Sequence, residues 1–309
     1  MRIYVTGGAG YLGCVLVRKL LADPSNEIVV VDRLDHGNLG LAEACGEQYK
    51  RVILARTWAK HAMPGSRESV PAADVIIHLA GIVGHPACSA DPYDAIRTNV
   101  CATDFVCQQA QLLGARLVFV STDSVYGPQL GRPVHEGTEL NPQSLYGQSK
   151  AMAERLVLEA GGTVLRLSSL FGPSPRMRWD LMVHYFYKTL TAGFTLNLYQ
   201  GGVSRALLHV EDAAAALQMA VTERIPPGIW GVGHERLVYR KRDLAREIAV
   251  VAGVGLGQIT EADTAVDIEC RDYNHDFEKI AHTGWVPAFG IAAGVAQLEA
   301  AHGTPRSEA

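Results

Sequence analysis

The stretch TGGAGYLG, residues Thr6–Gly13, overlaps the end of a strand-like apolar run, Ile3–Gly7, and opens a helix-like pattern over Tyr11–Ala22. Its glycines follow the pattern GxxGxxG. Small residues at this spacing let backbone amides approach a pyrophosphate, and the N-terminus of a following helix favours the negative charge. In this strand–turn–helix setting the pattern predicts a dinucleotide-binding site. The cofactor contacts expected from this turn are Gly7, Gly10, Tyr11, Leu12 and Gly13.

A second strand-like run, Glu27–Asp32, ends in an acid 19 residues after Gly13. An acidic side chain at this place accepts hydrogen bonds from ribose hydroxyls and repels a 2′-phosphate, which favours NAD over NADP as the cofactor. Arg33, directly after the acid, weakens this preference for NAD. The later segment HLAG (His78–Gly81) offers small residues against which a cofactor can lie. The cofactor contacts expected here are Asp32, Arg33, Leu79, Ala80 and Gly81.

Strand-like runs alternate with helix-like stretches through the first half of the chain. Each run is nearly continuous in Val, Ile and Leu, as expected for strands buried on both faces of a parallel sheet. The runs are Ile3–Gly7, Glu27–Asp32, Arg51–Ala55, Asp74–Gly81, Arg116–Thr122 and Thr163–Ser169, and helix-like stretches cover Tyr11–Ala22, about 94–113 and Leu145–Glu159. This rhythm predicts an α/β fold, a Rossmann-type doubly wound parallel sheet with a smaller C-terminal substrate-binding lobe.

The alternation weakens after residue 172. We expect a NAD-binding Rossmann domain over residues 1–172 together with about 204–233. The substrate-binding lobe is expected over about 173–203 and 234–300, and the polar residues 301–309 are expected to form a tail.

The composition excludes several classes of protein. The chain has 309 residues, of which 48% are hydrophobic and 19% charged, with a net charge of -4, so it can bury a core and shows no basic footprint for nucleic acid. No apolar run reaches the roughly 18 residues that span a membrane. Residues 1–5 already read as a strand, so we expect no signal peptide and a cytoplasmic location. The six cysteines lack CxxC or zinc spacing, and we expect reduced thiols and no metal.

A candidate proton acceptor lies near the middle of the chain. Tyr146 and Lys150 stand four residues apart in YGQSK, which puts both side chains on one face of the helix expected there. A lysine ammonium beside a phenol stabilises the phenolate, and an oxidised nicotinamide acts in the same direction. Thr122 follows a strand in STDSVYG, at the sheet edge where open α/β sheets bind ligands. Its hydroxyl is expected to hold the reacting oxygen of an alcohol or ketone.

The motifs TGGAGYLG, Asp32, HLAG, Asn99, STDSVYG and YGQSK follow a known order and spacing. The chain resembles the extended short-chain dehydrogenase/reductases, and within them the NAD-dependent nucleotide-sugar epimerase/dehydratase branch. The resemblance implies that Thr122, Tyr146 and Lys150 are catalytic, and Asp123 is a fourth catalytic candidate. It also implies that Asn99 supports the cofactor region and that Lys150 holds the nicotinamide ribose.

The C-terminal half continues the resemblance. LRLSSLFGPSPRMR is similar to the family's segment joining two lobes, and RALLHVEDAAAA to one in which an arginine grips the nucleotide diphosphate. The resemblance implies a phosphate clamp of Arg205 and Arg271, because a guanidinium fork matches phosphate oxygens. Arg176 is a further candidate, and Ser169 stands where many members have Asn. The substrate contacts expected are His85, Thr122, Asp123, Ser124, Ser169, Arg178, Arg205 and Arg271.

The residues after Thr122 bear on the reaction. In the family's 4,6-dehydratases the run is Thr-Asp-Glu, with the Asp as acid and the Glu as base toward C5. Here the run is Thr122-Asp123-Ser124, and serine lacks a pKa suited to removing a carbon-bound proton. This argues against a dehydratase and against a UDP-glucuronate decarboxylase, which shares the Glu. The resemblance favours a 4-epimerase acting through a transient 4-keto sugar; a deoxysugar 4-ketoreductase and a 4,6-dehydratase stay open as alternatives.

A contrasting possibility is a non-catalytic NAD-binding sensor, although Tyr146 and Lys150 are both retained here. The family usually dimerises through helices near 94–113 and 145–160. The resemblance therefore implies a homodimer that binds a nucleotide sugar. The net charge and the lack of a long apolar run predict neither nucleic acid nor a membrane as a partner.

Overall fold

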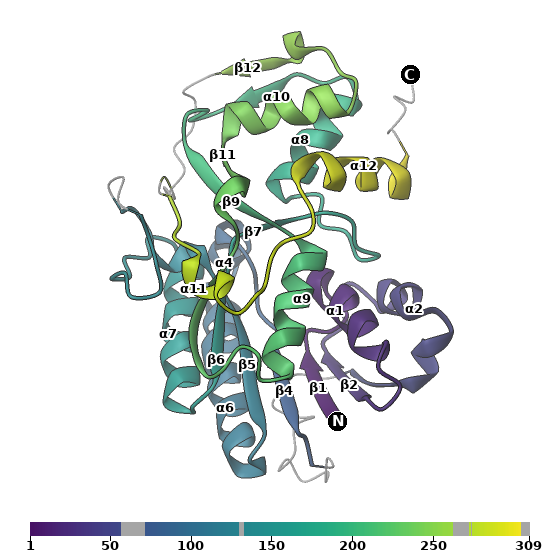
Figure 1. Cartoon of the computed structure of the whole chain (residues 1–309), viewed down its shortest axis with the longest axis vertical. Coiled ribbons are helices and arrows are strands. Elements are labelled where there is room, and N and C mark those ends of the chain that lie inside the picture. Colours follow the sequence, from purple (N-terminus) through teal and green to yellow (C-terminus); the bar gives the residue numbers. More distant parts are fainter. Residues whose placement is uncertain (57–71, 130–132, 262–271, 273, 304–309) are drawn as a thin grey trace.

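The computed structural model describes residues 1–56, 72–129, 133–261, 272 and 274–303. A seven-stranded sheet dominates the lower part of the molecule in Figure 1, in the order β10-β6-β5-β4-β1-β2-β3, and each neighbouring pair is parallel. Its strands are β1 (Arg2–Thr6), β2 (Glu27–Asp32), β3 (Val52–Arg56), β4 (Val75–His78), β5 (Arg116–Thr122), β6 (Thr163–Leu167) and β10 (Gly228–Val232). The predicted doubly wound parallel sheet is confirmed.

Alternating side chains of each strand pack on opposite faces of this sheet. On β1, Ile3 and Val5 join a core cluster with Leu16, whereas Tyr4 joins a separate cluster with Val106. Helices α1 (Tyr11–Leu21) and α9 (Val210–Val221) cover the first face, and α6 (Ala102–Leu113) and α7 (Leu145–Glu159) cover the second. Burial on both faces explains why these strands read as continuous apolar runs.

The strand order reverses between β1 and β4. The chain runs outward from β1 to β2 and β3, then returns to place β4 on the other side of β1. Parallel strands diverge into helices on opposite faces at such a reversal, which leaves a crevice at their carboxyl ends where ligands bind. The glycine-rich turn that follows β1 lies at this crevice.

Smaller elements lie above the carboxyl ends of the large sheet in Figure 1. A three-stranded sheet contains β7 (Ser169–Phe171), β9 (Ser204–His209) and β11 (Val238–Arg240), and a two-stranded sheet pairs β8 (Leu196–Leu198) with β12 (Ile259–Glu261). Helices α8 (Met182–Thr191), α10 (Lys241–Val251) and α12 (Ile291–His302) pack together with these strands around a third core cluster. The domain boundaries expected from the sequence stay a prediction.

The described chain also contains the shorter α-helices α2 (Leu39–Cys45), α4 (His85–Ala90), α5 (Pro92–Ile96) and α11 (Glu278–Ala281). Four 3₁₀ helices are described as well: η1 (Gly46–Arg51), η3 (Asp123–Val125), η4 (Glu235–Leu237) and η5 (Leu256–Gln258). The helix expected near 94–113 is built from α5 and α6, joined by one π-helical turn, η2 (Arg97–Cys101). Within the described ranges, no helix combines the length and the apolar character needed to cross a membrane.

Candidate active site

A cavity of about 1080 Å³ lies between the carboxyl ends of the large sheet and the smaller elements above it. Its wall includes residues of β2, β5, β6, β7, β8, β9, α8 and α10. The predicted site residues found in this wall are Gly7, Gly10, Tyr11, Leu12, Gly13, Asp32, Arg33, Leu79, Ala80, Gly81, His85, Thr122, Asp123, Ser124, Tyr146, Lys150, Ser169, Arg178 and Arg205. Arg271 lies outside the described residues. Segments far apart in the sequence thus meet at one cavity.

The glycine-rich turn packs too tightly for side chains. Gly7 has a φ of +72°, and a Cβ there would come within 2.7 Å of the Ala80 nitrogen. A Cβ on Gly13 would come within 2.4 Å of the Gly7 carbonyl oxygen. Gly10 caps α1 without a side-chain hydrogen bond, so the amides of the first helical turn are left for a ligand. This cradle fits a pyrophosphate.

Asp32 is held at the end of β2 by two backbone amides. Ala9 N–H donates to Oδ2 at 3.0 Å, and Leu34 N–H donates to Oδ1 at 2.8 Å. Each carboxylate oxygen keeps acceptor capacity for a further donor such as a ribose hydroxyl. The turn and this carboxylate together fit the adenosine half of NAD.

Thr122, Tyr146 and Lys150 reach the cavity from two elements. Thr122 ends β5 and caps the short 3₁₀ helix that follows, where Ser124 N–H donates to Thr122 Oγ1 at 3.2 Å. Tyr146 and Lys150 lie in the first two turns of α7, whose N-terminus is capped by the Ser144 hydroxyl. These three side chains are buried, as is Asp123, the fourth catalytic candidate. A cavity wall that buries both a phenol and an amine suits proton transfer from a bound alcohol.

The Lys150 side chain is buried beside an aromatic ring. Its Nζ is 4.0 Å from the centroid of the Phe119 ring. Burial lowers the pKa of Lys150 to about 7, and the Glu154 carboxylate one helical turn later acts in the opposite direction. A bound anion or phenolate nearby would favour the charged form of this amine.

Asn99 lies behind the cavity wall rather than in it. Its side-chain amide donates to the Ile82 carbonyl at 3.0 Å, and its Oδ1 accepts from Ile82 N–H at 2.7 Å. Ile82 follows Gly81 in the wall, so Asn99 fixes the backbone on which a cofactor would rest. The supporting role that the resemblance implies for Asn99 stays a prediction.

Besides Arg33, three arginine side chains line the cavity. Arg205 on β9 is buried, and its guanidinium donates to the Ser204 carbonyl at 2.8 Å. Arg178 donates to Asp180 Oδ1 at 3.1 Å, and Arg176 also lines the cavity. This concentration of cations suits an anionic substrate.

Two residues near the site were not anticipated from the sequence. His275 Nε2 lies 3.8 Å from Asp123 Oδ2, and both side chains are buried. Lys241 lines the cavity at the start of α10, with its Nζ 4.3 Å from the Tyr199 ring centroid. Neither residue was found from the sequence, because each contacts a side chain that is distant in the chain.

The family model of the NAD dependent epimerase/dehydratase family matches residues 3–233. The chain belongs to this family. Membership confirms the resemblance seen in the sequence and the expectation of NAD as the cofactor of an enzyme.

Individual relatives carry different reactions. UDP-glucuronic acid decarboxylase 3 of Arabidopsis thaliana is 30% identical over 314 residues, which cover 97% of this chain and 88% of the relative. The dTDP-glucose 4,6-dehydratase DesIV of Streptomyces venezuelae, solved with NAD, is 25% identical with a TM-score of 0.83 and covers 96% and 95% of the two chains. The UDP-glucose 4-epimerase of Thermus thermophilus, also solved with NAD, is 25% identical with a TM-score of 0.81 and covers 99% of each chain.

Proposed function

We propose that the protein is an NAD-dependent nucleotide-sugar 4-epimerase that acts through a transient 4-keto sugar. The observation that carries the proposal is the set of side chains at the end of β5 and the start of α7. Thr122, Tyr146 and Lys150 line one cavity, and Ser124 occupies the place where a dehydratase needs a carboxylate. The names of the relatives support a nucleotide sugar as the substrate.

Each of the three residues has a separate task in this proposal. The Thr122 hydroxyl holds the C4 oxygen of the sugar, the Tyr146 oxygen takes the hydroxyl proton, and the Lys150 ammonium stabilises the phenolate that forms. NAD, when bound, supplies the hydride acceptor and donor. Epimerisation then requires the keto sugar to turn its other face to the cofactor before Tyr146 returns the proton.

The residue after Asp123 supports epimerisation over dehydration. Removing the C5 proton requires a base, and the serine hydroxyl of Ser124 has no suitable pKa for that step. Its oxygen lies 3.3 Å from Thr122 Oγ1, within hydrogen-bonding distance of the residue proposed to hold the sugar. Asp123 is the feature that favours the second candidate, a 4-ketoreductase, because Thr-Asp also occurs in that branch.

Two further expectations belong to this proposal. Arg205 is proposed to clamp the nucleotide diphosphate, since its buried guanidinium lines the cavity. A homodimer is proposed through α5, α6 and α7, which expose the large apolar side chains Tyr93, Leu112 and Met152.

Mass spectrometry of the purified, denatured protein tests the cofactor and substrate class together. We expect NAD to be released in near-stoichiometric amount, because an epimerase regenerates it in each cycle and has no need to exchange it. A nucleotide sugar released with it would support the substrate class. Freely exchanging NAD that is lost on purification would favour the ketoreductase instead.

A further inference from the structure

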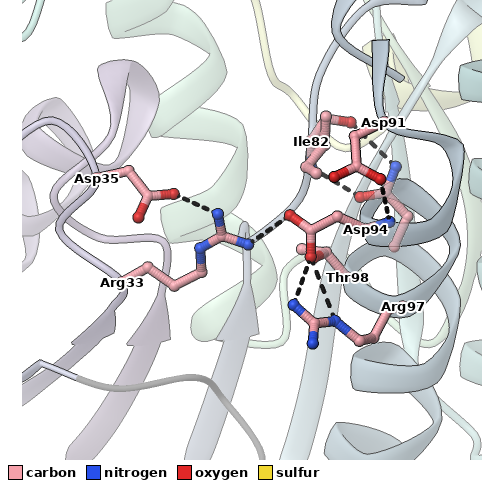
Figure 2. A network of polar contacts seen from close by, with 8 residues as sticks. Arg33, Asp35, Ile82, Asp91, Asp94, Arg97 and Thr98 are labelled. Carbon is pink, nitrogen blue, oxygen red and sulfur yellow. Dashed lines mark hydrogen bonds and ion pairs between the residues drawn. The ribbon is translucent and has the colours of Figure 1, made fainter. Parts of the chain in front are cut away.

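Arg33 stands in the cavity wall directly after Asp32, where a ribose 2′-hydroxyl of the cofactor is expected. An arginine at such a place can bind the 2′-phosphate of NADP, which would oppose the preference set by the acid. The structure gives this arginine other partners. Figure 2 shows its guanidinium between two carboxylates, with 2.6 Å to Asp35 Oδ2 and 2.9 Å to Asp94 Oδ2.

Asp94 is itself firmly positioned. It lies in α5, where its backbone N–H donates to the capping side chain of Asp91 at 2.9 Å. Its second oxygen, Oδ1, accepts from Arg97 at 2.7 Å and from the Thr98 hydroxyl at 3.4 Å (Figure 2). Its side chain is only 16% exposed. The hydrogen bond from Arg33 is the main cause that lowers the pKa of the Asp94 carboxyl, and the bond from Arg97 adds to it. The carboxyl is therefore ionised near neutral pH.

The charges around the expected ribose position therefore sum to a negative value. Four carboxylates, those of Asp32, Asp35, Asp91 and Asp94, meet three guanidiniums, those of Arg33, Arg97 and Arg176, which interacts with Asp32. A phosphate monoester carries about -1.5 to -2 charges at pH 7. It would meet net negative charge and an arginine whose two terminal nitrogens are already engaged.

We propose that Asp94 and Asp35 set the preference for NAD over NADP by holding Arg33 in ion pairs that a 2′-phosphate would have to break. Arg33 could bind a phosphate if it were released from these ion pairs. Asp94 is the specificity-determining residue that keeps it paired. The proposal rests on the NAD site of the proposed function. It differs from simple repulsion by Asp32, because it requires Arg33 for any gain in NADP binding.

The test is the affinity of Asp94→Asn for the two cofactors. The co-purified NAD is first removed, and NAD and NADP are then each titrated against the fluorescence of added NADH. The amide keeps the size of the side chain but loses its charge. We expect NADP to bind about tenfold more tightly than it binds the wild type, the gain of one charge-assisted hydrogen bond. NAD affinity is expected to change by less than about twofold, because a neutral hydroxyl has no comparable interaction with Arg33.

Two controls separate this mechanism from a general change in charge. Glu43→Gln, at an exposed position on α2, removes the same charge and should leave the NADP-to-NAD ratio unchanged. The double variant Asp94→Asn/Arg33→Gln should lose the NADP gain. An Asp94→Asn protein with an unchanged ratio, or a gain that persists in the double variant, would overturn the proposal.

If Asp94→Asn does not fold, a second variant tests the same proposal. Asp35→Asn releases Arg33 from its other carboxylate, at a side chain that is 52% exposed, and should also strengthen NADP binding. No gain in that variant, with Asp94→Asn unfolded, would overturn the proposal. Failure of the wild type to bind NAD would instead overturn the proposed function, so the two failures are distinguishable.

Discussion

The side-chain amide of Asn99 donates a hydrogen bond to the Ser149 hydroxyl at 3.0 Å. Ser149 in turn donates to the Tyr146 carbonyl at 2.8 Å. Since Asn99 also binds both backbone polar groups of Ile82, one buried side chain connects the loop after β4 with the helix that carries Tyr146 and Lys150. The loop after β4 and the turn of α7 that carries Tyr146 are therefore positioned by the same residue.

Replacing Asn99 with Ala removes these three bonds. The N–H of the half-buried Ile82 loses its bond to Asn99, whereas the Ile82 carbonyl keeps one from the Cys88 thiol at 3.3 Å. We expect a loss of about 1–3 kcal/mol in the free energy of unfolding, together with weaker NAD binding. Urea denaturation and cofactor titration measure the two effects. Asn38→Ala is a matched control, because that half-buried amide donates to the Tyr49 hydroxyl, at 3.1 Å, and does not line the cavity. Equal behaviour of the two variants would mean that Asn99 has no special role in the site.

Tyr146→Phe removes one oxygen and keeps the ring. We expect turnover to fall by at least about 100-fold, because proton transfer by a positioned group contributes a factor of this order. Bound NAD should be retained, since the cradle around Gly7 and Asp32 is untouched. Steady-state kinetics and mass spectrometry of the variant provide the two measurements. Activity close to that of the wild type would remove Tyr146 from its proposed role.

Arg205→Ala tests the proposed diphosphate clamp. Loss of one charge-assisted hydrogen bond, about 1.5–3 kcal/mol, should raise KM for a nucleotide sugar by about tenfold or more and change kcat less. Arg246→Ala on α10 is the control, because its side chain is 60% exposed. If KM responds equally to both substitutions, the clamp is not at Arg205.

Three buried histidines predict a loss of stability in mild acid. Burial lowers the pKa of His78 to about 3 and that of His184 and His209 to about 4. Below the ordinary histidine pKa of about 6.5, the unfolded chain binds protons that the folded protein does not, so stability falls as the pH falls from about 6.5 toward 4. Each histidine is expected to lower the free energy of unfolding by about 2 kcal/mol between pH 7 and pH 5.

Urea denaturation at a series of pH values measures this slope. His85→Gln should leave it unchanged, because the half-buried His85 lies at the cavity and bonds only weakly to Ser89, at 3.3 Å. A free energy of unfolding that is constant or higher at pH 5 would show that these histidines take up protons in the folded state.

The sequence predicts well those features that depend on residues close together in the chain. The turn at Gly7 and Gly13 follows from spacing alone, because no other residue fits so close to the Ala80 backbone and the turn itself. The parallel sheet follows from strands that are buried on both faces. Tyr146 and Lys150 share a helical face because they are four residues apart.

The features that the sequence does not reveal depend on pairs brought together by the fold. Arg33 and Asp94 meet only because β4 returns beside β1 and places α5 near the end of β2. His275 reaches Asp123 from a segment near the C-terminal end of the described chain. An arginine or a histidine in isolation gives no indication of such a partner.

The most direct test of the proposed 4-epimerase is NMR of the products formed from UDP-glucose, UDP-glucuronic acid and dTDP-glucose in D₂O. The proposal predicts a mixture of C4 epimers of one of these sugars, with protium retained at both C4 and C5, because the hydride returns to C4 and Ser124 leaves the C5 proton in place. A 4-keto-6-deoxy product carrying deuterium at C5, or a sugar that has lost its carboxylate, would contradict it.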